Sequence, residues 1–237
     1  MNPQPALYLF PVGLSDAPVG EVLPQANLEL LREMKHLVVE NVRTARRFLK
    51  SVDRSIDVNA IDFVELSEHT PAELIPAMLE PVTERGEAVG VLSEAGCPAV
   101  ADPGSDLVAA AQCRGITVVP LVGPSSILLS LMGSGFNGQS FAFIGYLPID
   151  EGRRAKQLKE MQRRITAERQ TQIFIETPYR NNKLIDELTR RLPSQMLLCV
   201  ASNLTSPQQS IITQPLSKWA SAKYDYNKVP TIFLLFN

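Results

Sequence analysis

Short apolar runs alternate with helical patterns through the first half of the chain. The runs lie at 6–12, 37–39, 61–66, 88–92 and 116–122. Between them, in 25–34 and 42–52, apolar residues recur near the 3.6-residue period of a helix. Strands that alternate with helices predict parallel βαβ units. We therefore expect residues 1–122 to form a mostly parallel sheet with helices on both faces.

The pattern changes after Val122. A Gly-Pro pair at Gly123-Pro124, an apolar helical segment and a glycine-rich patch at 133–138 indicate a domain junction. Strands are expected at 141–146, 172–176, 196–201, 210–213 and 231–236, with helices at 152–164 and 180–192. The last three strands are separated by only one short helical pattern, at 216–222, which favours antiparallel pairs. The sequence thus predicts an α/β protein whose second domain, 123–237, has a mixed sheet with helices.

Two helix starts carry capping patterns. Asp102 suits the N-cap of a helix that has Pro103 in its first turn. Thr70 begins a capping-box pattern for a second helix, which Pro76 and Pro81 must interrupt. The loop 93–101 before Asp102 exceeds the usual two to six or so residues of such a connection, which indicates a site.

Composition is that of a globular protein. The chain has 237 residues, of which 45% are hydrophobic and 20% charged, and a formal net charge of −2. This charge argues against indiscriminate nucleic-acid binding. Because no apolar run approaches the ~20 residues that span a bilayer and the start has no basic segment followed by a hydrophobic one, we expect a cytoplasmic protein without membrane contact.

Cysteine and histidine offer little chemistry. The three cysteines, Cys97, Cys113 and Cys199, and the two histidines, His36 and His69, have no disulfide or metal-ligand spacing. Cys97 lies in the long loop and is either a reactive thiol or, more commonly for such residues, a small buried one. Catalysis must then rest on carboxylates, hydroxyls, backbone dipoles or a bound cofactor, with no metal.

The candidate ligand site lies beyond the carboxyl ends of the parallel strands. The loop after residue 92 and the segment Gly123 to Ser126 both lie there, and the latter adds two hydroxyls and a helix N-terminus. Neither segment matches a dinucleotide fingerprint or a phosphate-binding loop. Glu94 would repel a polyphosphate but suits ammonium, sulfonium or ribose hydroxyl groups. S-adenosylmethionine therefore fits better than ATP or NAD.

Several motifs occur together in one order along the chain. They are Leu7-Tyr8-Leu9, Glu40-Asn41-Val42-Arg43, the stretch VLSEAGCPAVADPGSDLV at 91–108, VPLVGP at 119–124, Gly145-Tyr146-Leu147-Pro148, Gly152-Arg153-Arg154 and Ile173-Phe174-Ile175-Glu176-Thr177. In this order they resemble the tetrapyrrole methylase superfamily, in particular its small-subunit ribosomal RNA methyltransferase I branch. The resemblance implies two α/β domains with S-adenosylmethionine in a cleft between them, a homodimer, and methylation of a ribose 2′-oxygen in small-subunit ribosomal RNA.

The resemblance also implies the cofactor contacts. Carried over by position, they are Pro11, Val12, Gly13, Ser93, Glu94, Ala95, Gly96, Ser125, Ser126, Glu176, Thr177, Asn203 and Leu204. The chain departs from the family pattern at Asn41, Glu94 and Asn203, where the family has Asp, Asp and Glu. Backbone contacts survive such changes, whereas contacts that need a particular side chain do not.

A ribose hydroxyl acceptor needs a group to take its proton. Glu40, Glu94 and Glu176 are the candidates, and Asp102 is the weakest because capping already explains it. Residues 150–170 carry seven Lys or Arg against four Asp or Glu, with Ala155, Leu158, Met161 and Ile165 on one apolar face. The expected RNA-binding residues are Arg43, Arg153, Arg154 and Lys156, and the alternative for the basic helix is a solvated face.

Two other functions remain open at this point. One is a methylase of the same superfamily that acts on a small molecule such as a tetrapyrrole. The other is a non-catalytic S-adenosylmethionine-binding protein, suggested by the changes at Asn41 and Asn203.

Overall fold

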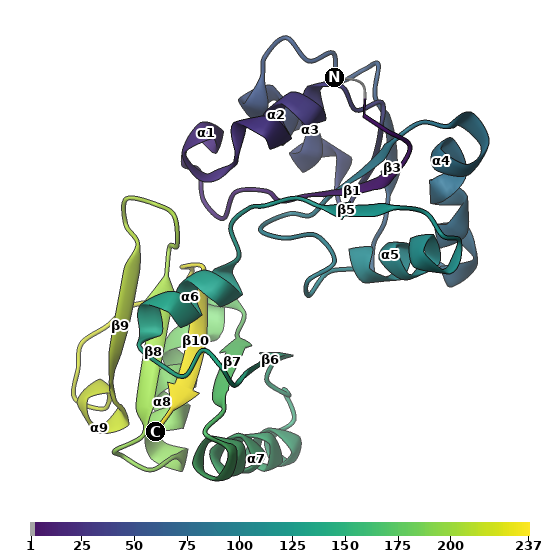
Figure 1. Cartoon of the computed structure of the whole chain (residues 1–237). Helices are drawn as coiled ribbons and strands as arrows, with labels where there is room; N and C mark the ends of the chain where they lie inside the picture. The colour runs from purple at the N-terminus through teal and green to yellow at the C-terminus, as the bar shows by residue number, and fades with distance from the viewer. Residues whose placement is uncertain (1–2) are drawn as a thin grey trace. The chain divides into compact units, whose positions relative to one another are not determined.

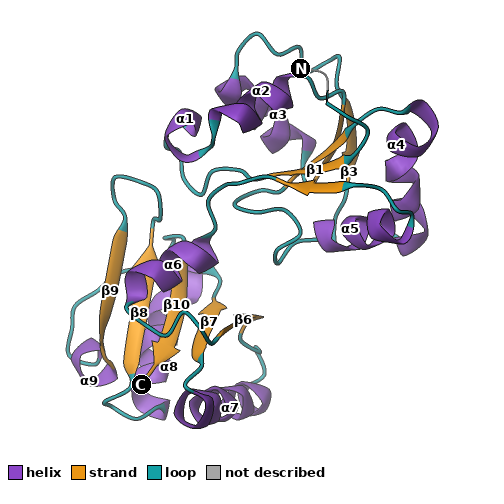
Figure 2. Cartoon of the chain, in the orientation of Figure 1, coloured by secondary structure: helices purple, strands orange, loops and turns teal. Residues whose placement is uncertain are grey.

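The computed structural model describes residues 3–237, which fold into two compact units (Figure 1). Within the described residues, unit 1 ends at Ser125 and unit 2 is Ser126–Asn237. Each unit contains one sheet covered by helices (Figure 2). None of the helices in residues 3–237 combines the length and the hydrophobicity that a transmembrane span requires.

Unit 1 is built on a parallel sheet, as the alternating pattern predicts. Its strands are β1 (Leu7–Phe10), β2 (His36–Val39), β3 (Asp62–Glu65), β4 (Val89–Leu92) and β5 (Val118–Pro120). They lie in the order β3-β2-β4-β1-β5, and every pair is parallel. The carboxyl ends of all five strands therefore meet at one edge.

Helices cover both faces of this sheet. They are α1 (Val19–Val22), α2 (Gln25–Arg32), α3 (Val42–Val52), the 3-10 helix η1 (Ala72–Leu79), α4 (Glu80–Arg85) and α5 (Gly104–Cys113). Leu31 of α2 and Leu49 of α3 pack with Phe10 on one face, whereas Leu79 of η1 and Leu107 of α5 pack with Leu7 on the other. Alternate residues of β1 thus point into two separate cores.

The capping box expected at Thr70 is wrong. The Thr70 hydroxyl accepts from Ser67 N at 2.9 Å, in the loop before the helix. Pro71 occupies the N-cap position without a side-chain cap, and the helix is 3-10 rather than α. Because Pro76 inside η1 and Pro81 in α4 have no N–H to donate, a continuous α-helical ladder cannot form.

Unit 2 has the mixed sheet that the sequence predicts. Its strands are β6 (Phe141–Tyr146), β7 (Thr171–Ile175), β8 (Leu197–Ser202), β9 (Ser210–Pro215) and β10 (Thr231–Phe236). Their order is β6-β7-β10-β8-β9, in which only β6 and β7 are parallel neighbours. Because β7 and β8 both run antiparallel to β10, they share a direction, and their carboxyl ends lie at the same edge.

The helices of unit 2 enclose this sheet. They are α6 (Ser126–Ser134), α7 (Glu151–Glu168), η2 (Pro178–Arg180), α8 (Asn181–Arg191) and α9 (Leu216–Trp219). Leu158, Met161 and Ile165 of α7 are buried against the core that α8 and α9 complete, which confirms the expected apolar face. The opposite face is covered by α6, whose Gly133 lies against Ile211 of β9.

Candidate functional site

The loops that follow β1, β4 and β5 meet at the carboxyl edge of the unit 1 sheet. Val12 N donates to Gly96 O at 2.8 Å, and Gly96 N donates to Val12 O at 3.1 Å. Gly123 packs so closely on Pro11 that an added Cβ would lie 2.2 Å from the proline Cβ. These backbone contacts bring the segments 11–13 and 93–96, both expected to bind cofactor, into one cluster.

Gly96 is the centre of this cluster. Its backbone is left-handed, with φ +78°, and it is buried. An added Cβ would lie 3.3 Å from Leu14 Cδ2 and 3.6 Å from Pro124 O. Because L side chains rarely adopt this conformation, the position favours glycine.

Asp102 fixes the far end of the loop, although it is not the N-cap. Pro103 holds the N-cap position of α5 and gives no side-chain cap. Asp102 Oδ1 accepts from Ala99 N at 2.7 Å and from Gly104 N at 2.9 Å, so it ties the loop to the first turn. Ala99 and Ala101 both have positive φ, which the carboxylate bridge helps to maintain.

Cys97 behaves as a structural thiol. Its Sγ donates to Pro124 O at 3.5 Å. Burial, and to a lesser degree the charge of Asp102, raises the pKa of the Cys97 thiol, which disfavours the reactive thiolate. In residues 3–237, no group of three or more His, Cys, Asp or Glu is placed to hold a metal ion.

Glu40 and Glu94 lie together at the edge. Glu40 Oε1 accepts from Glu94 N at 3.1 Å, and Thr44 donates its hydroxyl to the Glu94 carboxylate. Burial raises the pKa of Glu40; the hydrogen bond from Glu94 N opposes this, and the nearby charge of Asp102 adds to it. Glu40 is half-buried, whereas Glu94 is exposed. At this edge, the Glu40 carboxylate is therefore suited to take a proton, whereas the Glu94 carboxylate is open to solvent.

Asn41 preserves the local structure despite its departure from the family pattern. Its side-chain oxygen caps α3 by accepting from Arg43 N at 2.9 Å and Thr44 N at 3.2 Å. Beside it is a hollow of about 40 Å³ whose lining includes Val12, Glu40, Asn41, Thr44, Ser93 and Glu94. A space of this size admits a hydroxyl or ammonium group rather than a whole nucleoside. A larger ligand must extend along the open edge.

In unit 2, the expected contacts lie at one edge of the sheet. Glu176 and Thr177 follow β7, and Asn203 and Leu204 follow β8, on either side of the start of β10. Asn203 N donates to Pro230 O at 3.0 Å, and its φ is +49°. Ser125 and Ser126 do not follow a strand of this sheet. Ser126 is the first residue of α6, and Ser125 directly precedes it.

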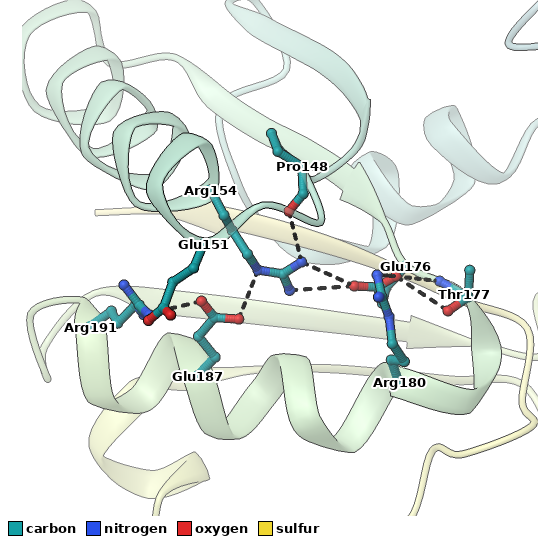
Figure 3. Close-up of polar contacts among 8 residues, drawn as sticks. All are labelled: Pro148, Glu151, Arg154, Glu176, Thr177, Arg180, Glu187 and Arg191. Carbon is teal, nitrogen blue, oxygen red and sulfur yellow. Dashed lines mark hydrogen bonds and ion pairs between the residues drawn. The ribbon is translucent and has the colours of Figure 1, made fainter.

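Glu176 is held by arginines (Figure 3). Its Oε1 accepts from Arg180 Nη2 and Thr177 N, both at 2.7 Å, and its Oε2 accepts from Arg154 Nη2 at 3.3 Å. Burial acts to raise the pKa of Glu176, but the hydrogen bonds from Arg180 and Thr177 and the charges of Arg180 and Arg154 outweigh it, so the pKa is lowered. Glu176 is thus a weaker proton acceptor than Glu40, and it is suited to positioning Thr177.

Arg154 is not available to RNA, which corrects the expectation from sequence. It is 8% exposed, and its Nε lies 2.7 Å from Glu187 Oε2 while its guanidinium also reaches Glu176. Arg43, Arg153 and Lys156 are exposed, as phosphate contacts require. Arg163 and Arg164 pair with Glu160 on the surface of α7.

Replacing Arg154 with methionine is expected to lower the free energy of unfolding by about 3–5 kcal/mol, because two carboxylates lose a buried partner. Urea unfolding measures the change. Arg153→Met is the matched control, since the Arg153 side chain is 78% exposed and a surface ion pair contributes roughly 0–1 kcal/mol. Equal stability of the two variants would contradict the structural role of Arg154.

Sequence reasoning missed the partners that complete these networks. Thr44 orients Glu94, while Arg180, Glu187 and Arg191 surround Arg154 and Glu176. The i,i+4 spacing of Glu187 and Arg191 is a helical ion-pair signal, and Arg154 lies on the same helical face as Leu158 and Met161. The contacts between α7 and α8 have no comparable signal.

The chain matches a known protein family and several of its named members. The model of the tetrapyrrole (corrin/porphyrin) methylases matches residues 7–220. The chain is 28% identical over 217 residues to ribosomal RNA small subunit methyltransferase I of Vibrio cholerae, covering 92% of this chain and 71% of that protein. It is 30% identical over 213 residues to the protein of that name from Mesorhizobium japonicum, covering 90% and 68%.

A solved structure agrees on the fold. Uroporphyrin-III C-methyltransferase from Thermus thermophilus, complexed with S-adenosylhomocysteine, superposes with a TM-score of 0.58 at 19% identity, covering 98% of this chain and 97% of that one. The chain therefore belongs to the tetrapyrrole (corrin/porphyrin) methylase family, and it resembles the ribosomal RNA small subunit methyltransferase I proteins within it.

Proposed function

We propose that this protein transfers a methyl group from S-adenosylmethionine to small-subunit ribosomal RNA. The observation that carries the proposal is the Val12–Gly96 backbone bridge, which gathers the loops expected to bind cofactor beside Glu40 and Glu94. The relatives whose names describe this activity match most of the chain. The cofactor, when bound, supplies a methyl group already activated on a sulfonium.

The residues present fit this cofactor. The hollow beside Glu94 accepts a hydroxyl or ammonium group, and a carboxylate there favours both. In unit 1, the backbone of 93–96 and 11–13, with Ser125, would hold the remainder. In unit 2, Ser126, Glu176, Thr177, Asn203 and Leu204 are the contacts that the family resemblance implies. Because the positive charge on sulfur disappears during transfer, a carboxylate directly at sulfur would stabilise the ground state more than the transition state. Glu94 is therefore assigned to hydroxyl or ammonium groups.

We assign the acceptor as a ribose 2′-oxygen and its proton acceptor as Glu40. The Glu40 carboxylate is half-buried and fixed by the N–H of Glu94, so it is held at the cofactor loop. It would take the hydroxyl proton as the oxygen attacks the methyl carbon and the carbon–sulfur bond breaks. Most of the rate enhancement would come from aligning these atoms.

The proposal includes a homodimer in the cytoplasm. Family resemblance supports the dimer, and the 52% exposed Leu128 and 80% exposed Met132 on α6 supply apolar surface for it. The cytoplasmic location follows from a ribosomal substrate. Light scattering coupled to gel filtration tests the oligomeric state.

Methyl transfer to purified ribosomal subunits tests the function. With methyl-labelled S-adenosylmethionine, label is expected in the RNA of the small subunit and not in that of the large one. Glu94→Ala is expected to lower this transfer by roughly 10-fold or more, since a charge-assisted hydrogen bond to the cofactor is lost. Glu84→Ala, at an exposed position of α4, is the control. If the wild-type protein transfers no label to the RNA, the proposal is contradicted. That result favours a small-molecule acceptor or a non-catalytic protein.

A further inference from the structure

A groove of about 480 Å³ lies in unit 2 between the start of α7, the end of β7 and one face of α8. Its lining includes the basic residues Arg154, Arg180, Lys183, Arg190 and Arg191. Lys183, Glu187 and Arg190 follow one another at spacings of four and three residues, so they lie on the same face of α8. Figure 3 shows the floor of this groove, where Arg154 reaches between Glu176 and Glu187.

The charges in the groove do not cancel. Five basic side chains line it against three acidic ones, Glu151, Glu176 and Glu187. Three arginines satisfy these carboxylates: Arg154 and Arg180 pair with Glu176, Arg154 with Glu187, and Arg191 with Glu187 and Glu151. Within residues 3–237, no ion pair or hydrogen bond involves the side chain of Lys183 or of Arg190, and both residues are exposed. The groove thus presents two cations over a floor whose charges are paired.

We propose that this groove binds the sugar–phosphate backbone of the RNA substrate, with Lys183 and Arg190 on separate phosphates. The inference rests on the proposed function, because it takes ribosomal RNA as the substrate. Seven residues of helix separate the two cations by about 10 Å along the axis, which suits two phosphates of one strand better than a single anion. Arg154, buried in the floor, serves to position Glu176 and Glu187.

An exposed apolar residue of the groove, and an exposed aromatic residue next in sequence to a groove residue, favour a nucleic acid over other polyanions. Ile149 lines the groove and is 82% exposed. Tyr179 directly precedes Arg180, and it is 74% exposed. Aromatic rings beside a cationic groove are the usual platform on which unpaired bases stack.

The test compares two double variants that remove equal charge. Lys183→Gln/Arg190→Gln changes the groove, whereas Lys159→Gln/Lys218→Gln removes two exposed lysines of unit 2 that do not line it. Binding of deproteinised small-subunit ribosomal RNA is measured by fluorescence anisotropy over a series of salt concentrations. Thermal unfolding checks that both variants fold.

The groove variant is expected to bind about 10-fold more weakly than the control variant, and the slope of log K against log salt should flatten by about 1.4 to 1.8, as expected for two lost phosphate contacts. Its KM for RNA rises while kcat and S-adenosylmethionine affinity stay unchanged. Equal affinity and slope in the two variants would overturn the groove assignment even if wild-type protein methylates the RNA. Absence of methylation by wild-type protein, with the slope change present, instead overturns the proposed function and leaves the groove assigned.

Discussion

Gly96→Val is expected to weaken S-adenosylmethionine binding by about 100-fold or more. A displacement of about 1 Å among the groups of a site can have an effect of this size. Valine cannot adopt φ +78° without strain, and its Cβ would press on Leu14 at 3.3 Å. The loop must then move away from Val12, which separates the segments proposed to hold the cofactor. Isothermal titration calorimetry with S-adenosylmethionine measures the loss.

Gly115→Val separates this effect from backbone strain in general. Gly115 has a similar φ of +67°, but no atom lies within 4 Å of an added Cβ. Gly115 follows the C-terminal end of α5, whereas the loop 93–101 precedes the N-terminal end of that helix. The variant is expected to lose roughly 1–2 kcal/mol of stability and to keep its cofactor affinity. If Gly96→Val bound the cofactor as tightly as Gly115→Val, the proposed cofactor loop would be wrong.

Glu40→Gln is expected to lower kcat for RNA methylation by about 100-fold to 10,000-fold, the range found for a general base. Glutamine keeps an oxygen that can accept from Glu94 N, so the loop stays in place and S-adenosylmethionine affinity should not change. Single-turnover methyl transfer measures the chemical step directly. Glu65→Gln is the control, because Glu65 also carries a carboxylate at this edge and accepts from Val42 N at 3.2 Å.

The pH dependence of the reaction follows from the raised pKa of Glu40. Only the ionised carboxylate can take a proton, so the rate should fall as the pH is lowered through that pKa, which lies above the ordinary value of 4.5. The acid limb should disappear in Glu40→Gln. A variant with wild-type kcat and an unchanged acid limb would remove Glu40 from the mechanism.

Most of the fold could be predicted because hydrophobic periodicity reports burial directly. In β1, Leu7 and Tyr8 point into cores on opposite faces, and the run of buried residues this produces is the mark of a parallel strand. Parallel strands place their carboxyl ends together, so the loop after residue 92 and the segment Gly123 to Ser126 were expected at one edge. The contact between Cys97 Sγ and Pro124 O joins these two segments.

Features that depend on tertiary pairing could not be predicted in the same way. Arginine is typically a surface residue, and only the contacts of Arg154 with Glu176, after β7, and with Glu187 of α8 reveal its burial. The left-handed backbone of Ala99 and Ala101 has no signal in residue type, because alanine disfavours it. Asp102 carried a capping signal, yet its carboxylate also reaches back to Ala99, a contact that only the folded loop creates.

Ribose methylation in small-subunit ribosomal RNA, mapped in cells that carry the wild-type protein, the Gly96→Val variant or no copy of it, tests the proposed function most directly. A 2′-oxygen methylation is expected with the wild-type protein and in neither of the other two. Identical methylation in all three would contradict the proposed function.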